Sequence, residues 1–165
     1  MRDRRQARSV SRAGINAPEH LNTGHDFSEF DSGVPALDEW LKRRALANED
    51  GGASRTYVLC AAGRVIAYYA LAMGDVALQT AVMVLGRLAV DKAYQGKGLG
   101  RALLRDAVLR TLQAAALGGI RAILVHAISD EAKRFYASCG FAPSPLDPMM
   151  LMITVADAEK ALTGQ

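Results

Sequence analysis

The segment that decides the fold is Leu88-Ala-Val-Asp-Lys-Ala-Tyr-Gln-Gly-Lys-Gly-Leu-Gly-Arg-Ala-Leu-Leu104. Its pattern predicts an apolar strand, then a glycine-rich turn, then the first turns of an amphipathic helix. The glycines leave no side chains between the backbone and an incoming group, and the amides of Gly98 through Arg101 would lie at the positively polarised start of the helix. Lys97 and Arg101 would add full positive charges. The segment therefore predicts a cradle for a diphosphate group.

Three phosphate-binding motifs compete for these glycines. A Walker A loop needs Ser or Thr after its lysine, but Gly98 follows Lys97, so the hydroxyl that binds Mg²⁺ is missing. A dinucleotide fingerprint needs Gly-x-Gly-x-x-Gly and an acidic residue about 20 positions later, where this chain has Leu117-Gly-Gly-Ile120. The third motif, Gln/Arg-x-x-Gly-x-Gly/Ala, is matched by Gln95, Gly98 and Gly100. The plain alternative is a glycine-rich turn that only begins a helix.

The composition fits one globular domain. The chain has 165 residues, of which 50% are hydrophobic and 22% charged, and this is enough to bury a substantial core. We expect residues 1–16 to form a disordered basic tail and residues 17–165 to form a single domain. Cys60 and Cys139 do not make a disulfide framework. No apolar run reaches the roughly 18 residues of a membrane span, and we therefore expect a cytoplasmic protein without a membrane partner.

Positive charge is concentrated at the start of the chain. Residues 1–12 hold five arginines and one aspartate, whereas the net charge of the whole chain is only +3. A polyanionic partner would therefore need a local patch on the folded part. The candidates are Lys42-Arg43-Arg44 and the set Lys92, Lys97, Arg101 and Arg105. Each of them also fits a solvated helix face.

The order of apolar patterns predicts a mixed α/β sheet, of the α+β kind, with one βαβ unit at its centre. The predicted elements are helix 32–47, strands 55–62 and 64–73 joined by a turn, strand 81–90, helix 99–117, strand 120–127, helix 130–138, strand 149–155 and helix 156–162. The strand–helix–strand segment from Leu85 to Ala127 should bring two parallel strands together.

A second motif follows the glycine turn. Phe135-Tyr-Ala-Ser-Cys-Gly-Phe141 lies at the end of a short predicted helix, and with the turn at Gln95 it makes the chain resemble the GNAT N-acetyltransferases from Tyr57 to Val155. Further segments resemble one subgroup, the GNAT-type toxins of bacterial toxin–antitoxin modules. These segments are Trp40-Leu-Lys-Arg-Arg-Ala45, Gly52-Ala-Ser-Arg-Thr56, Gly86-Arg-Leu-Ala-Val90, Leu124-Val-His-Ala127, Ser129-Asp-Glu-Ala132 and Pro143-Ser-Pro-Leu-Asp-Pro-Met-Met-Leu-Met152. The chain departs from the subgroup in the short loop Gly74–Thr80.

The resemblance implies a fold, a reaction and partners. It implies the GNAT fold and transfer of an acetyl group from acetyl-CoA, without a metal, to the α-amino group of aminoacyl-tRNA, which blocks translation. It also implies neutralisation by a ribbon-helix-helix antitoxin, binding of operator DNA only through the antitoxin complex, and a homodimer. One alternative is a GNAT enzyme that acts on another amine, such as a protein N-terminus, a small metabolite or an antibiotic. Another is a catalytically inactive fold that serves as a repressor partner or RNA-binding module.

The resemblance also assigns the site. Tyr136 matches the family's catalytic tyrosine, and its phenol, with an ordinary pKa of about 10, would give a proton to the departing sulfur; a tyrosine that only packs its helix is the alternative. The expected cofactor-binding residues are Leu88, Ala89, Val90, Gln95, Gly96, Lys97, Gly98, Gly100, Arg101 and Ser129. Ser129 could instead only cap its helix. His126, Asp130 and Glu131 are candidate helpers in deprotonating the amine, a step for which water alone could suffice.

Overall fold

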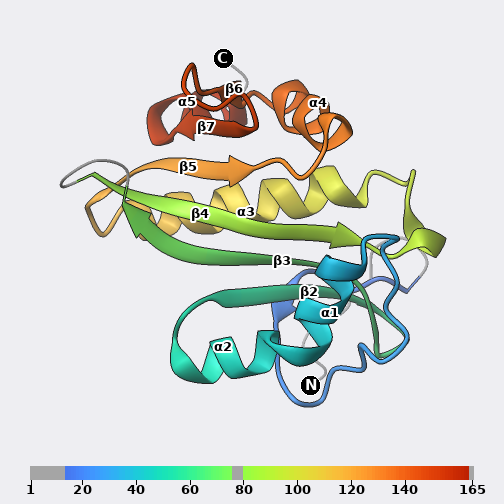
Figure 1. Ribbon diagram of the computed structural model, residues 1–165. Helices are drawn as coiled ribbons and strands as arrows, with labels where there is room; N and C mark the ends of the chain where they lie inside the picture. The colour runs from blue at the N-terminus through green and yellow to red at the C-terminus, as the bar shows by residue number, and fades with distance from the viewer. Residues whose placement is uncertain (1–13, 76–79, 164–165) are drawn as a thin grey trace. The chain divides into compact units, whose positions relative to one another are not determined.

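The computed structural model describes residues 14–75 and 80–163 (Figure 1). The elements in chain order are β1 (Glu19–His20), α1 (Pro35–Arg43), α2 (Ala45–Gly51), β2 (Arg55–Ala61), β3 (Arg64–Asp75), β4 (Ala81–Val90), a 3₁₀ turn (Lys92–Tyr94), α3 (Leu99–Ala115), β5 (Ile120–His126), α4 (Asp130–Ser138), β6 (Ala142–Pro143), β7 (Met150–Thr154) and α5 (Val155–Leu162). The strands follow the order β1-β2-β3-β4-β5-β7-β6 in a mixed sheet. The predicted mixed α/β class is confirmed.

The described residues fall into two compact units. The first contains residues 14–70 and 87–103, and the second contains the described parts of 71–86 and 104–163. Residues 1–13 of the expected basic tail and residues 76–79 of the short loop lie outside the described part of the chain. Among the residues that we assigned to the tail, Ile15 forms a β-bridge with Ala61 of β2.

The core of the first unit is built around α1 and the centre of β3. Trp40 of α1 stacks on Tyr68 of β3, with ring centroids 5.9 Å apart and an interplanar angle of 12°. The Tyr68 hydroxyl donates a hydrogen bond of 2.6 Å to the carbonyl of Leu37. Because Tyr68 is fully buried, this bond satisfies a phenol that has little access to water. The contacts fix α1 on the sheet and determine where the Trp40 ring lies.

The prediction of one helix over 32–47 is wrong. The structure has two helices that meet at Arg44, whose φ of −123° and ψ of −25° lie outside the helical region. Leu41 before the break and Ala45 after it are both buried. The second helix then runs to Gly51 and ends at Gly52, which has a left-handed φ of 73°.

The predicted hairpin of β2 and β3 is present, and its two-residue turn explains the strand pairing. Ala62 and Gly63 have φ values of 51° and 80°, so both central residues are left-handed, as in a type I′ turn. The neighbouring strand β1 was missed. It has only two residues, which pair with Tyr57 and Val58 of β2, and such a short strand leaves no period in the sequence.

The second unit contains the predicted parallel strand pair. β4 and β5 run parallel, with register from Ala81↔Ile120 to Leu85↔Val125, and α3 connects them, so the βαβ prediction is confirmed. β5 also pairs antiparallel with β7, placing Ile123 opposite Ile153 and Val125 opposite Leu151. The buried residues of α3 recur at helical spacing and are Leu103, Leu104, Ala107, Val108 and Thr111. The two-residue strand β6, which pairs with β7, was also missed.

The ends of the other predicted helices agree with the structure to within about one turn. α3 ends at Ala115 rather than 117, before Gly118 and Gly119 with φ values of 108° and 94°. α4 has the predicted bounds, and α5 begins one residue early at Val155, where the Thr154 side chain accepts a hydrogen bond from the Asp157 amide. Within the described residues, none of the helices is long and apolar enough to span a membrane.

Candidate active site

The strand, glycine turn and helix predicted from Leu88–Leu104 are all present in the structure. β4 ends at Val90, and Asp91 caps the 3₁₀ turn by accepting a 3.0 Å hydrogen bond from the amide of Ala93. Gln95 is extended, with φ of −68° and ψ of 155°, and the next three residues lead directly into α3 at Leu99. The local signals therefore place the turn at the N-terminus of a 17-residue helix, where free amides and the helix dipole favour an anion.

Two glycines of the turn are required by backbone conformation. Gly96 and Gly98 have φ values of 77° and 80°, and a Cβ built on either would meet no described atom within 4 Å. The left-handed backbone, and not crowding by the protein, is thus what excludes side chains here. The open space beside both residues is the space that phosphate oxygens would need to reach the backbone amides. The turn therefore fits a diphosphate group.

The side chain of Gln95 holds the turn in place. Its Nε2 atom donates hydrogen bonds to the carbonyl of Ser32 at 2.9 Å and to the carbonyl of Val90 at 2.8 Å. The amide of Lys92 donates to the Asp31 carbonyl at 2.9 Å, which adds a second tie to the same N-terminal segment. The sequence predicted Gln95 as a cofactor contact. In the structure, both acceptors of the Gln95 side chain are carbonyl groups of the protein's own backbone. This side chain therefore orders the turn.

Cations lie along the turn and at the start of α3. Lys97 Nζ lies 5.2 Å from the centroid of the Tyr94 ring, and Lys97 and Arg101 are both exposed. Lys92 differs from these two because its Nζ is 3.4 Å from an Asp31 carboxylate oxygen. The amide of Gly33 and the charge of Lys92 lower the pKa of Asp31. Asp31 therefore offsets part of the positive charge of Lys92. Lys97 is the better placed of the two lysines to bind an anion.

Three of the expected cofactor-binding residues, Leu88, Ala89 and Val90, lie at the end of β4. Its register with β5 extends to Leu85, and the strand then continues to Val90. Ala89 is buried, whereas Leu88 and Val90 are half-buried. These three residues thus lie on the stretch of β4 beyond the last residue pair with β5. A strand in this position can offer backbone groups to an extended amide chain.

Tyr136 lies on α4, in the second unit. Its side chain is buried, with 7% of the residue exposed, and its ring meets Phe135 and Phe141 edge-on at 5.2 and 5.9 Å. Burial, with a smaller contribution from Cys139, raises the pKa of Tyr136 to about 12. Within the described part of the chain, the Tyr136 hydroxyl makes no hydrogen bond. The phenol therefore keeps its proton at neutral pH and has it available for a ligand.

The remaining predicted side chains on or near α4 are more exposed. Ser129 caps α4 by accepting a 3.1 Å hydrogen bond from the amide of Ala132, which is the structural role that the sequence left open. His126, Asp130 and Glu131 are all exposed. None of these three side chains is enclosed by the protein, so the structure singles out none of them as the base for the amine.

One cluster of metal-ligand types occurs among the described residues, away from the glycine turn in sequence. Ligand atoms of Glu19, His25 and Cys60 lie within 4.8 Å of one another. However, His25 Nδ1 accepts a 3.0 Å hydrogen bond from the Asn22 amide, so the ring proton is on Nε2, which faces Glu19 at 2.8 Å. Burial also raises the pKa of the Cys60 thiol to about 11. Glu19 and His25 thus form a hydrogen-bonded pair, and the thiol beside them is buried and protonated.

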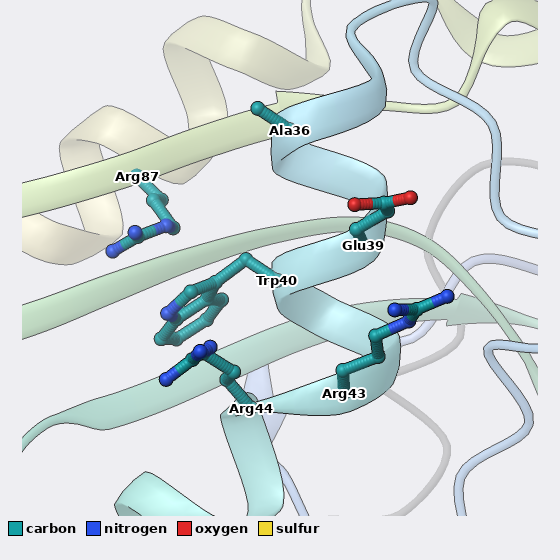
Figure 2. Close-up of a pocket in the computed structure, with 6 residues that line it drawn as sticks. All are labelled: Ala36, Glu39, Trp40, Arg43, Arg44 and Arg87. Atoms are coloured by element: carbon teal, nitrogen blue, oxygen red, sulfur yellow. The ribbon is translucent and has the colours of Figure 1, made fainter.

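The sequence did not predict a cavity in the first unit. The cavity measures about 290 Å³ and is lined by Ala36, Glu39, Trp40, Arg43, Arg44 and Arg87 (Figure 2). The basic triplet Lys42-Arg43-Arg44 indicated positive charge in this region of the sequence, without indicating a cavity. The contribution of Arg87 could not be found in that way, because this residue comes from β4.

Known proteins are similar to this chain over most of its length. Residues 52–143 match the acetyltransferase (GNAT) domain. A tRNA-acetylating toxin of Mycobacterium tuberculosis strain ATCC 25618 / H37Rv is 47% identical, over 92% of this chain and 99% of the relative.

Solved structures of similar fold agree with this family. A mutant of the toxin AtaT bound to the C-terminus of the antitoxin AtaR and acetyl-CoA has a TM-score of 0.83 at 27% identity, covering 92% of this chain and 99% of that one. AtaT complexed with acetyl-methionyl-tRNAfMet has a TM-score of 0.81 at 25% identity, covering 90% and 99%. The AtaT–AtaR complex bound to DNA has a TM-score of 0.79 at 29% identity, covering 88% and 99%. With a matching domain over more than half of its residues and a relative of nearly equal length, this chain belongs to the GNAT acetyltransferase family.

Proposed function

We propose that this protein transfers the acetyl group of acetyl-CoA to the α-amino group of an aminoacyl-tRNA and thereby acts as a toxin that blocks translation. The observation that carries the proposal is the 47% identity with a tRNA-acetylating toxin over 92% of the chain. The similar folds of AtaT with acetyl-methionyl-tRNAfMet and with acetyl-CoA support the same reaction. An acetylated α-amine is no longer a nucleophile, so an aminoacyl-tRNA modified in this way cannot accept a growing peptide.

The glycine turn and β4 hold acetyl-CoA in this proposal. Backbone amides of Gly96, Gly98 and Gly100 receive the diphosphate at the start of α3, and Lys97 and Arg101 add charge. Leu88, Ala89 and Val90 offer backbone groups to the amides of the pantetheine chain, as an added strand would. One amide of this stretch faces the thioester oxygen and stabilises the negative charge that develops there. Acetyl-CoA supplies the activated acetyl group.

Tyr136 is the proposed general acid. Its hydroxyl hydrogen moves to the coenzyme sulfur as the carbon–sulfur bond breaks, and the amine nitrogen forms the new bond to the acetyl carbon. The nitrogen loses its surplus proton to water, and the phenolate regains a proton from water. The raised pKa, about 12, keeps the phenol protonated before the reaction. The α-amine has an ordinary pKa near 8 and is partly neutral at pH 7.

The partners follow from the same relatives. We propose that a ribbon-helix-helix antitoxin neutralises the protein, that operator DNA is bound only through the toxin–antitoxin complex, and that the protein acts as a homodimer in the cytoplasm. The complexes of AtaT with its antitoxin and with DNA support the first two statements.

Radiolabelled acetyl-CoA tests the reaction. Purified protein would be incubated with labelled acetyl-CoA in separate reactions, each with one kind of acceptor. The acceptors are a pool of charged tRNA, uncharged tRNA, peptides with free N-termini and small amines. We expect label on charged tRNA that is released as an N-acetyl amino acid by mild base, and no label on uncharged tRNA. Label on peptides or small amines with none on charged tRNA would instead assign a GNAT enzyme of another substrate class.

A further inference from the structure

The cavity at α1 holds guanidinium groups that lack a counter-charge. Arg44 and Arg87 line it together with Arg43, and Glu39 is the one acidic lining residue. Within the described residues, no ion pair or hydrogen bond joins any of these arginine side chains to an acceptor. Figure 2 shows the guanidinium groups of Arg44 and Arg87 directed toward the Trp40 indole. Positive charges gathered in this way repel one another, and an anion in the cavity would relieve the repulsion.

Arg87 is held rigidly by an aromatic stack. Its Cζ atom lies 4.3 Å from the centroid of the Trp40 ring, whose other neighbour is the stacked ring of Tyr68. Burial is the main cause of the lowered pKa of Arg87, and the nearby charge of Arg44 contributes in the same direction. A guanidinium fixed on an indole keeps its planar set of donors in one orientation, which suits bidentate binding of a phosphate.

The position of Arg87 along β4 matches the geometry of a charged tRNA. Arg87 precedes Val90 by three residues, which is about 10 Å along a strand. In an aminoacyl-tRNA, about eight covalent bonds separate the α-amine from the phosphate on the 5′ side of the terminal adenosine, or on the order of 10 Å when extended. An amine at the Val90 end of β4 would therefore bring this phosphate within reach of Arg87.

We propose that the cavity formed by Trp40, Arg44 and Arg87 binds a phosphate of the single-stranded 3′ end of the acceptor tRNA. This inference rests on the proposed function and names the residues that would distinguish a charged tRNA from a small amine. A cavity of about 290 Å³ is at the lower end of ligand-site volumes, which suits one phosphate with its ribose and not a paired stem. The planar guanidinium of Arg87 orients the phosphate, and the stacked rings of Trp40 and Tyr68 keep this guanidinium in place.

Three charge-matched variants test the proposal. Arg44→Gln and Arg87→Gln each remove one charge from the cavity, and Arg121→Gln removes one charge from an exposed position on β5. The expected result is a KM for charged tRNA about tenfold higher in each cavity variant, because a charge-assisted contact is lost. We expect kcat and the affinity for acetyl-CoA to stay close to those of the wild type, and Arg121→Gln to leave KM unchanged. The salt slope of tRNA binding should also fall by about 0.7 for one lost phosphate contact.

The controls separate this proposal from its competitors. Melting temperatures identify any variant that is unfolded, and Arg44→Gln, at an exposed position between two helices, carries the test if Arg87→Gln is unstable. Equal KM values for Arg44→Gln and Arg121→Gln would overturn the cavity proposal while leaving the reaction intact. A defect that disappears with acetyl-dephospho-CoA would overturn it as well, because the cavity would then hold the 3′-phosphate of the coenzyme.

A wild-type protein that acetylates no charged tRNA would instead overturn the proposed function, and this inference with it. The two failures are thus distinguishable by the wild-type reaction alone.

Discussion

Replacing Gln95 by Glu should weaken acetyl-CoA binding by disordering the turn before the ligand arrives. The change keeps the size of the side chain but exchanges its two-donor amide nitrogen for an acceptor. Two hydrogen bonds, at 2.9 Å to the Ser32 carbonyl and 2.8 Å to the Val90 carbonyl, would be replaced by contacts between oxygen atoms. Each such bond contributes about 1 kcal/mol, net of the hydrogen bonds to water that replace it.

The resulting loss is about 2 kcal/mol of loop ordering, which corresponds to a dissociation constant for acetyl-CoA about 30-fold higher. Calorimetric titration measures this constant, and hydrogen exchange of residues 95–101 in the ligand-free protein measures the order of the turn. Gln113→Glu, an exposed change within α3, is the matched control. Wild-type affinity together with wild-type exchange would refute the anchoring role. Weakened binding with unchanged exchange would make Gln95 a direct ligand contact instead.

Four further substitutions or reactions have expected outcomes. Tyr136→Phe should lower kcat by about 10²-fold or more with acetyl-CoA affinity unchanged. Because the pKa of Tyr136 is raised to about 12, the kcat of the wild type should show no decline from phenol ionisation below about pH 10. Gly98→Asp should raise the acetyl-CoA dissociation constant at least about tenfold in calorimetry, because a carboxylate would face the phosphates. Ala62→Asn should relieve the left-handed φ of 51° and stabilise the fold by about 0.5–1 kcal/mol, seen as a melting temperature about 1–4 °C higher. Cys60, whose pKa burial raises to about 11, should react with Ellman's reagent at pH 8 only after unfolding, whereas the less buried Cys139 should react in the native protein.

The elements that were predicted correctly are those whose signals are local. The cap at Ser129 and the left-handed pair Gly118-Gly119 determine their helix ends through neighbouring residues, so α4 and the end of α3 follow from sequence pattern alone. The break at Arg44 has no such signal. It consists of one non-helical residue, and the apolar spacing through this region fits a continuous helix equally well.

The two short strands were missed for a different reason. β1 and β6 have two residues each, and each exists only because a longer strand offers it backbone partners. A period of two cannot be recognised in two residues. Such strands become visible only once the sheet is present.

The diphosphate cradle and the cavity, the two parts of the proposed site, also differ in how local their sequence signals are. A diphosphate cradle needs backbone amides in particular conformations, and consecutive residues from Gln95 to Arg101 encode them. The support of that cradle is not local, because Gln95 reaches a carbonyl 63 residues earlier. The cavity is less local still, since Trp40 comes from α1 and Arg87 from β4, and neither segment's pattern indicates that the two residues meet.

This difference has a consequence for substrate choice. Acetyl-CoA would be held mainly by the main chain of the glycine turn, whereas the acceptor would be held by side chains of α1 and β4. Substitutions at Trp40, Arg44 and Arg87 can therefore change the acceptor while the glycine turn and its anchor Gln95 stay intact. We thus expect acceptor preference and coenzyme affinity to vary independently in this protein, because the first depends on a stack of side chains from distant segments and the second on one continuous stretch of backbone.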